Sequence, residues 1–286
     1  MNLRLMTSDD IPAAMRLKDL AGWNQTAADW ERFLAASPAG CFVAELEGRV
    51  CGTVTTIVYE GRFAWIGMVL VDPDYRGRGI GTRLLEGAIE HLDGLGVPTL
   101  KLDATPQGKP LYSKLGFVSE YEIERWTLKR PPPKDPSAPQ MVRGQAMAEV
   151  PDLGAIAKLD RHVFGADRSA ALNSLDDEAP EFTLAIDAAG ELAAYALGRH
   201  GSRADHLGPW VAKDEASARS LLAEFVHRSK REHIFVDCMK SSSFACEFVR
   251  AMGFEFSRLL TRMYRGANHY PGTPEVVGAI LGPEFG

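Results

Sequence analysis

One stretch, residues 66–92, constrains the fold more than any other part of the chain. It reads IGMVLVDPDYRGRGIGTRLLEGAIEHL. Its first six residues are apolar and three of them are β-branched, which is typical of a buried strand. Asp72 and Pro73 end this strand, because proline lacks a ladder donor and fixes φ. Between Leu84 and Leu92 apolar residues recur at helical spacing, so the stretch predicts a strand, a turn and a helix.

The turn between this strand and helix is rich in glycine and arginine, with the sequence RGRGIG from Arg76 to Gly81. Glycine lets a backbone approach a ligand without a Cβ collision. The first N–H groups of a helix lack internal partners and lie at its positive end, so the turn favours a phosphate or pyrophosphate. The order Arg-x-x-Gly-x-Gly matches neither a P-loop nor a Rossmann motif.

This stretch resembles the coenzyme A signature of the GNAT acetyltransferase superfamily. In that signature a strand ending in Val-x-Pro precedes Arg/Gln-x-x-Gly-x-Gly/Ala and a helix, and the matching residues here are Val71, Pro73, Arg76, Gly79 and Gly81. The resemblance implies that acetyl-CoA binds along a strand that separates from its neighbour at a bulge. The cofactor-binding residues that it implies are Val69, Leu70, Val71, Arg76, Gly77, Arg78, Gly79, Ile80, Gly81, Thr82 and Thr105.

Length and composition limit the class of protein. The 286 residues exceed one ordinary domain, so two are expected, and the net charge of −6 argues against a nucleic-acid binder. The four cysteines form no Cys-x-x-Cys pair, so we expect buried reduced thiols and no metal site. The sequence contains no apolar run long enough for a membrane span and no secretory signal, so we expect a cytoplasmic protein.

Hydrophobic patterns in residues 1–130 predict the order β-α-α-β-β-β-α-β-α-β. The predicted strands cover residues 3–6, 41–46, 50–59, 63–71, 100–103 and 121–128. Helices are predicted before Ala21, over 29–36, after Gly81 and before Gly116. The pattern alone indicates a mixed α/β sheet, and the order agrees with the fold that the GNAT resemblance implies.

The remaining chain looks like a second copy of the same domain. Five prolines between Arg130 and Pro139 predict an extended linker over 131–140. Afterwards the triplet Asp10-Ile11-Pro12 has a counterpart in Glu149-Val150-Pro151, and Gly116-Phe117 has one in Gly253-Phe254. The expected domains are therefore 1–130 and 141–286, an arrangement that resembles the YitH-like tandem-GNAT acetyltransferases.

The second copy lacks the chemistry of the first. The counterpart of the signature strand, Leu207–Ala212, is followed by Lys213-Asp214-Glu215 and by no Arg-x-x-Gly-x-Gly. Acidic residues there would repel phosphates. Val249 stands where the first copy has Tyr112. We expect the second domain to be degenerate, keeping the fold with a structural or acceptor-site role but without binding acetyl-CoA.

The resemblance also implies catalytic residues. Tyr112 matches the tyrosine that protonates the thiolate of coenzyme A, and a phenol with a pKa near 10 suits that role. The alternative is that Tyr112 only packs at the end of the sheet. Thr105 stands where many relatives have Asn. Asp103 is a candidate general base or a cap for the turn after it. Other candidate bases are Glu31, Tyr59, His200 and His206, and an ordered water chain is a further alternative.

The acceptor site is expected beside the first two helices. Trp23, Asn24 and Trp30 are candidate acceptor-binding residues there, and for each tryptophan a purely core role is the alternative. The resemblance predicts an N-acetyltransferase that transfers an acetyl group to a primary amine of a small molecule. A homodimer is compatible with this prediction. A non-catalytic acyl-CoA sensor and a protein N-acetyltransferase are the alternatives.

Overall fold

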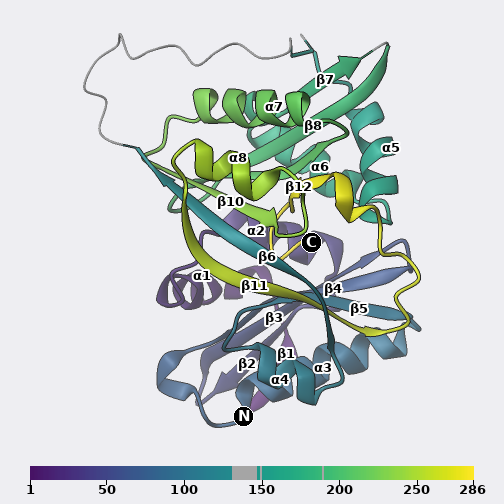
Figure 1. Ribbon diagram of the computed structural model, residues 1–286. Helices are drawn as coiled ribbons and strands as arrows, with labels where there is room; N and C mark the ends of the chain where they lie inside the picture. Colours follow the sequence, from purple (N-terminus) through teal and green to yellow (C-terminus); the bar gives the residue numbers. More distant parts are fainter. Residues whose placement is uncertain (131–146, 149, 189) are drawn as a thin grey trace. The chain divides into compact units, whose positions relative to one another are not determined.

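The computed structural model describes residues 1–130, 147–148, 150–188 and 190–286, so the predicted linker over 131–140 lies outside the described residues. The chain divides into two compact units (Figure 1). Unit 1 comprises Met1–Glu120, Arg262–Tyr270 and Glu284–Gly286. Unit 2 comprises Tyr121–Thr261 and Pro271–Pro283.

The two units do not follow the expected ranges 1–130 and 141–286. β6 (Val118–Lys129) enters unit 2 at Tyr121, and β11 (Glu255–Gly266) ends with five residues in unit 1. The sequence does not indicate to which domain the segment from Arg265 onward belongs. In the structure, residues 265–270 and 284–286 belong to unit 1. Local sequence patterns contain no signal for a return across more than 150 residues.

Residues 1–130 contain every element that the sequence predicts for them, and all of these except the last strand, β6, lie in unit 1. Its strands are hydrogen-bonded in the order β1-β2-β3-β4-β5, and β11 follows beside β5. The strands are β1 (Asn2–Leu5), β2 (Phe42–Leu46), β3 (Arg49–Tyr59), β4 (Phe63–Val71) and β5 (Thr99–Ala104). The helices are α1 (Ile11–Leu20), α2 (Ala27–Ala36), α3 (Ile80–Gly94) and α4 (Lys109–Lys114). β1 to β4 pair antiparallel, whereas β4 and β5 are parallel.

The core of unit 1 lies between the sheet and α3. Leu84, Leu85 and Ala88 of α3 are fully buried against residues of β3 and β4 that include Val54 and Ile66. This confirms the apolar stripe that the sequence predicts for α3. α1 and α2 also pack on β3 (Figure 1). Helices thus cover the sheet, and the turn before α3 follows the carboxyl end of the inner strand β4.

The strands of unit 2 are both parallel and antiparallel and are hydrogen-bonded in the order β6-β10-β12-β9-β8-β7. Its strands are β7 (Leu184–Ala188), β8 (Glu191–His200), β9 (Asp205–Ala212), β10 (His233–Met239) and β12 (Val277–Ala279). Its helices are α5 (Leu153–Phe164), α6 (Ser169–Glu178), α7 (Glu215–Arg228) and α8 (Ala245–Ala251). The order of elements repeats that of unit 1, which confirms the tandem mixed α/β architecture.

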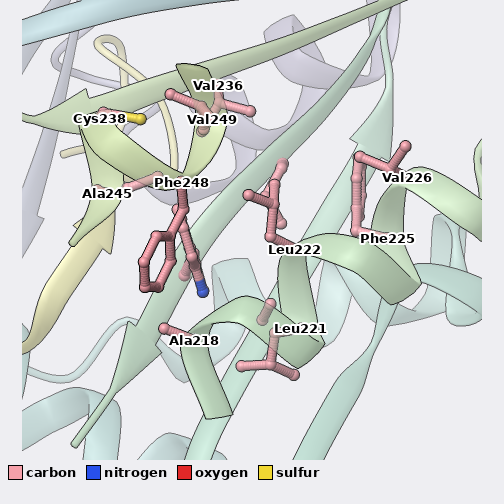
Figure 2. Packing of buried hydrophobic residues seen from close by; sticks show 14 of the residues in the cluster. Ala218, Leu221, Leu222, Phe225, Val226, Val236, Cys238, Ala245, Phe248 and Val249 are labelled. Atoms are coloured by element: carbon pink, nitrogen blue, oxygen red, sulfur yellow. The ribbon is translucent and has the colours of Figure 1, made fainter. Parts of the chain in front are cut away.

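The core of unit 2 forms around α7 and α8. Figure 2 shows Leu222 and Phe225 of α7 and Phe248 of α8 in one cluster of buried side chains. Three side chains are fully buried because each helix presents an apolar stripe to the sheet. The duplication therefore preserved the packing scheme of the fold.

Three wider expectations concern the chain as a whole. The four cysteines are free thiols, and three of them are buried as predicted, whereas Cys246 is half-buried; burial raises the pKa of Cys41 to about 11. Among the described residues, no cluster of three or more His, Cys, Asp or Glu side chains is arranged to hold a metal ion. Within the same residues, no helix is both long enough and apolar enough to cross a membrane.

Candidate active site

β4 contains a bulge just before the signature turn. The register with β3 pairs Thr55 with Gly67 and Thr53 with Leu70, so two β4 residues lie opposite one β3 residue. Met68, one of these two, has φ of 51°, a conformation that is uncommon outside glycine. The Thr53 hydroxyl donates a 2.8 Å hydrogen bond to the Met68 carbonyl oxygen and holds it there. A bulge bends the strand and redirects the residues that follow.

Beyond the first part of β4, the strand has no ladder with β5. The parallel pairing covers Ala64 with Leu100 and Trp65 with Lys101. β4 nevertheless continues to Val71, and β5 continues to Ala104. The separation expected from the resemblance is therefore present in the backbone of the described residues. The edge of Val69–Val71 that faces β5 lies outside that ladder, so its backbone polar groups are placed to bind an extended ligand.

The turn after β4 is anchored by a buried carboxylate. Asp72 is 2% exposed and accepts a 2.6 Å ion-pair contact from Arg16 and a hydrogen bond from the Asp74 amide. Burial alone would raise the pKa of Asp72, but the contacts from Arg16 and Asp74 outweigh it and hold the pKa below its usual value. The carboxylate thus remains charged and fixes the direction in which the chain leaves the sheet.

The glycine-rich turn adopts a backbone that only glycine accepts readily. Gly77 and Gly79 have φ of 76° and 77°. A Cβ atom on either would have no protein atom within 4 Å, so the space beside both is open. The Arg83 amide donates to Gly79 O, which leaves the amides of Ile80–Thr82 without an intrahelical acceptor.

The charge around the turn is positive. Arg76 and Arg78 are exposed, and the Arg78 guanidinium lies 5.3 Å from the centre of the Tyr75 ring. The first turn of α3 contains no acidic residue. Free amides, the helix dipole and two arginines thus converge at one edge of unit 1, an arrangement suited to a pyrophosphate.

Tyr112 lies in α4, with its ring against the Gly108 backbone and edge-on to Phe117 at 6.3 Å. Burial raises the pKa of Tyr112 to about 12, so its hydroxyl keeps its proton at neutral pH. Among the described residues the structure gives this hydroxyl no hydrogen-bond partner. A protonated, unengaged phenol can donate to a ligand.

Thr105 and Asp103 are both engaged within unit 1. The Thr105 hydroxyl accepts a 3.2 Å hydrogen bond from the Gly108 amide and so caps the turn before α4. The two Asp103 carboxylate oxygens each accept a 2.8 Å hydrogen bond from Arg262, which also packs on the Trp65 ring. The structure thus gives the capping bond to Thr105, and it places Asp103 in an ion pair that the sequence did not reveal.

The three candidate acceptor residues differ in exposure. Trp23 is half-buried, and Asn24 is 2% exposed. Trp30 is fully buried and packs edge-on against Phe33 with ring centres 6.4 Å apart. Its indole N–H nevertheless has no hydrogen-bond partner among the described residues. Trp30 is therefore a core residue that also presents an unused donor.

The remaining candidate bases do not gather at one place in unit 1. Glu31 is exposed on α2, and the Tyr59 hydroxyl donates a 2.8 Å hydrogen bond to the Phe285 carbonyl oxygen. His200 and His206 lie in unit 2. His200 contacts Asp205 and Glu181, and His206 lies 3.1 Å from Asp237.

The same positions in unit 2 are filled by the chain itself. β9 and β10 pair in parallel from Asp205 with Ile234, and β12 then lies between them, antiparallel to both. At the start of α7 the Asp214 carboxylate accepts a 2.8 Å hydrogen bond from the Ser217 amide. A strand thus occupies the gap between the two strands, and a carboxylate occupies the helix N-terminus.

Sequence reasoning missed a further part of unit 1. A Cβ atom on Gly67 would lie 2.7 Å from the Glu284 carbonyl oxygen, so the backbone of Glu284, which belongs to unit 1, lies directly on β4. The one available signal is Gly67 itself, because glycine inside a strand often marks close approach of another backbone.

Comparison with known proteins agrees with this architecture. A model described as "Acetyltransferase (GNAT) family" matches residues 11–117, and one described as "Acetyltransferase (GNAT) domain" matches residues 156–277. A putative acetyltransferase from Pyrococcus horikoshii has the same fold, with a TM-score of 0.80, 24% identity and coverage of 100% of this chain and 95% of that chain.

Two curated relatives span most of the chain. Holothin acyltransferase from Pseudoalteromonas sp. (strain SANK 73390) is 25% identical over 266 residues, 92% of this chain and 87% of the relative. The uncharacterized N-acetyltransferase YitH from Bacillus subtilis (strain 168) is 24% identical over 214 residues, 75% of this chain and 74% of the relative. Since both halves match the same family, the chain belongs to the GNAT acetyltransferases and is a transferase with two GNAT domains in tandem.

Proposed function

We propose that the chain is an acetyl-CoA-dependent N-acetyltransferase in which unit 1 binds the cofactor and performs the transfer to a primary amine of a small molecule. One observation supports this most: β4, whose end has no ladder with β5, leads directly into an open, positively charged glycine turn. This places unused strand amides and unused helix amides along one continuous path of backbone. An acyl-CoA needs both, because its pantetheine arm is extended and its pyrophosphate is anionic.

In this proposal the pyrophosphate binds the amides of residues 76–82, and the thioester lies along Val69–Val71. The strand amides hydrogen-bond the pantetheine and polarise the acetyl carbonyl. Gly77 and Gly79 leave open space, so the phosphates reach the backbone without a side chain between them. The exposed Arg76 and Arg78 add positive charge.

Tyr112 is the proposed acid. A neutral amine attacks the thioester carbonyl, the C–S bond breaks, and the departing thiolate takes the phenol proton. The phenoxide regains a proton from the nitrogen, so the residue is unchanged after turnover. The raised pKa keeps the phenol protonated, so its proton is available when the thiolate forms beside it.

Unit 2 is proposed to keep the fold without a cofactor. β12 fills the gap between β9 and β10, and Asp214 occupies the helix N-terminus that a pyrophosphate would need. A chain with two GNAT domains then binds one acetyl-CoA.

The test is release of free coenzyme A, followed with a thiol reagent. The purified chain is given acetyl-CoA and longer acyl-CoAs with a panel of amines, amino acids and polyamines, because one relative is named an acyltransferase for holothin. We expect turnover with one acceptor class, and its loss in Gly79→Glu, which puts a negative charge into the turn. Tight acetyl-CoA binding without turnover with any amine would contradict the enzyme and favour a sensor or a protein acceptor.

A further inference from the structure

The last three residues, 284–286, form a short segment that is built into unit 1. Glu284 and Phe285 are 3% and 1% exposed. The Phe285 ring stacks on Phe33 of α2, with ring centres 4.6 Å apart and planes 6° apart. The Tyr59 hydroxyl donates to the Phe285 carbonyl oxygen at 2.8 Å. A stacked ring and a buried hydrogen bond fix the position of Glu284, which precedes Phe285.

This segment lies on β4 beside the bulge. The Glu284 backbone contacts Gly67, the residue before Met68, and leaves no space for a Cβ atom on Gly67. Ile66 faces the core beneath α3, and side chains alternate along a strand, so Gly67 faces the opposite side of the sheet. Glu284 is therefore on the face of β4 away from α3, within two residues of the backbone that is proposed to hold the thioester.

Two further groups in this part of unit 1 are buried polar atoms without a partner. Thr55 is the cross-strand partner of Gly67, and its hydroxyl is fully buried without a hydrogen bond among the described residues. The Trp30 indole N–H, also fully buried and without a partner there, belongs to the ring that packs on Phe33. Buried polar groups are normally satisfied, and each of these two groups still has a hydrogen bond to donate.

We propose that Glu284 receives the acceptor amine in unit 1. The inference rests on the proposed acetyltransferase function and adds the residue that selects a cationic acceptor. An acceptor amine is protonated at neutral pH, and a buried carboxylate attracts it more strongly than an exposed one does. Glu284 is an acidic residue whose backbone the fold places against the strand of the thioester, from a distance of more than 200 residues along the chain.

The proton balance of the step is simple. The ammonium of the acceptor transfers one proton to the Glu284 carboxylate and becomes a neutral amine. The amine nitrogen forms the new C–N bond, the C–S bond breaks, and Tyr112 protonates the leaving thiolate. Tyr112 regains the second proton from the nitrogen, and Glu284 releases the first to solvent. The products are an N-acetyl amide, free coenzyme A and one proton.

The test compares Glu284→Gln with Glu90→Gln, a matched change of an exposed glutamate on α3 in the same unit. For an acceptor that the wild type acetylates, Glu284→Gln should lower kcat/KM for the amine by about 100-fold, a usual effect of losing a general base. The Kd for acetyl-CoA should stay within about twofold, because the cofactor is bound elsewhere. The loss should shrink above about pH 9, where the solution already supplies neutral amine. Glu90→Gln should behave as wild type.

A second variant moves the residue instead of replacing it. Gly67→Ala would put a Cβ atom 2.7 Å from the Glu284 carbonyl oxygen, so the segment must shift, and kcat/KM for the amine should fall in this variant too. A value for Glu284→Gln within about twofold of wild type at neutral pH, or a loss that is independent of pH, would overturn the inference. The proposed function fails if the wild type acetylates no amine. The inference about Glu284 alone fails if the wild type acetylates an amine and Glu284→Gln does so equally well, so the two failures are distinguishable.

Discussion

Replacing Gly79 with alanine tests the glycine turn with the smallest possible change. Gly79 has φ of 77°, and no protein atom lies within 4 Å of where its Cβ would be. The protein itself therefore has room for the methyl group, and only the backbone conformation opposes it. A ligand that binds in this space would clash with the methyl group.

The two costs can be separated by magnitude. Holding alanine in the left-handed region costs about 1–2 kcal/mol. Gly79 is also the N-cap of α3, where alanine is poorer than glycine by roughly 0.5 kcal/mol. These costs lower the stability of the domain but do not unfold it, because the free energy of unfolding of a domain is about 5–15 kcal/mol. Losing one charge-assisted contact to the pyrophosphate costs about 1.5–3 kcal/mol, which weakens acetyl-CoA binding by about 10- to 100-fold.

The assay is calorimetric titration with acetyl-CoA, together with thermal unfolding. Gly48→Ala is the matched control, because Gly48 has φ of 75° and equally open space but lies in the β2–β3 turn. Both variants should lose a similar stability, and only Gly79→Ala should lose affinity. Equal affinity for acetyl-CoA in the two variants would refute the assignment of the turn to the cofactor.

Three further predictions follow from unit 1 and unit 2. Tyr112→Phe should lower kcat about 100-fold while the Kd for acetyl-CoA is unchanged. Because the pKa of Tyr112 is about 12, its ionisation should cause no fall of the wild-type kcat between about pH 7 and 10. Pre-steady-state rate measurements check both expectations. Asp214→Ala should cost about 1 kcal/mol of stability at pH 7 without creating a second acetyl-CoA site. The hydrogen bonds from Ser217 lower the folded-state pKa of Asp214, so this difference should be present above the unfolded pKa of about 4 and disappear as denaturation is followed to lower pH. Asp237→Asn should cost about 3–5 kcal/mol in urea unfolding, because it leaves the buried Arg125 without its charged partner.

Much of the local structure of unit 1 could be predicted from the sequence. β4 begins and ends at the predicted residues, 63 and 71, because apolar residues and Pro73 mark it locally. Gly77 and Gly79 were recognised for the same reason, since the positive φ that they adopt is a property of glycine. Short-range signals of this kind are complete within the stretch that contains them.

The features that were missed depend on distant parts of the chain. Asp103 was assigned from its place at a strand end, but its partner, Arg262, is 159 residues away. β12 contains only three residues, and its place between β9 and β10 follows from tertiary pairing. The approach of Glu284 to Gly67 likewise left one glycine as its only local trace. Long-range pairing selects such contacts, and no periodicity records them.

In the proposed function, one of the two related domains binds the cofactor and the other does not. Isothermal titration of the full chain with acetyl-CoA tests it most directly, because the stoichiometry counts the sites. We predict one site per chain, abolished by Gly79→Glu in unit 1 and unaffected by Asp214→Ala in unit 2. Two sites per chain, or one site that survives Gly79→Glu, would contradict the account.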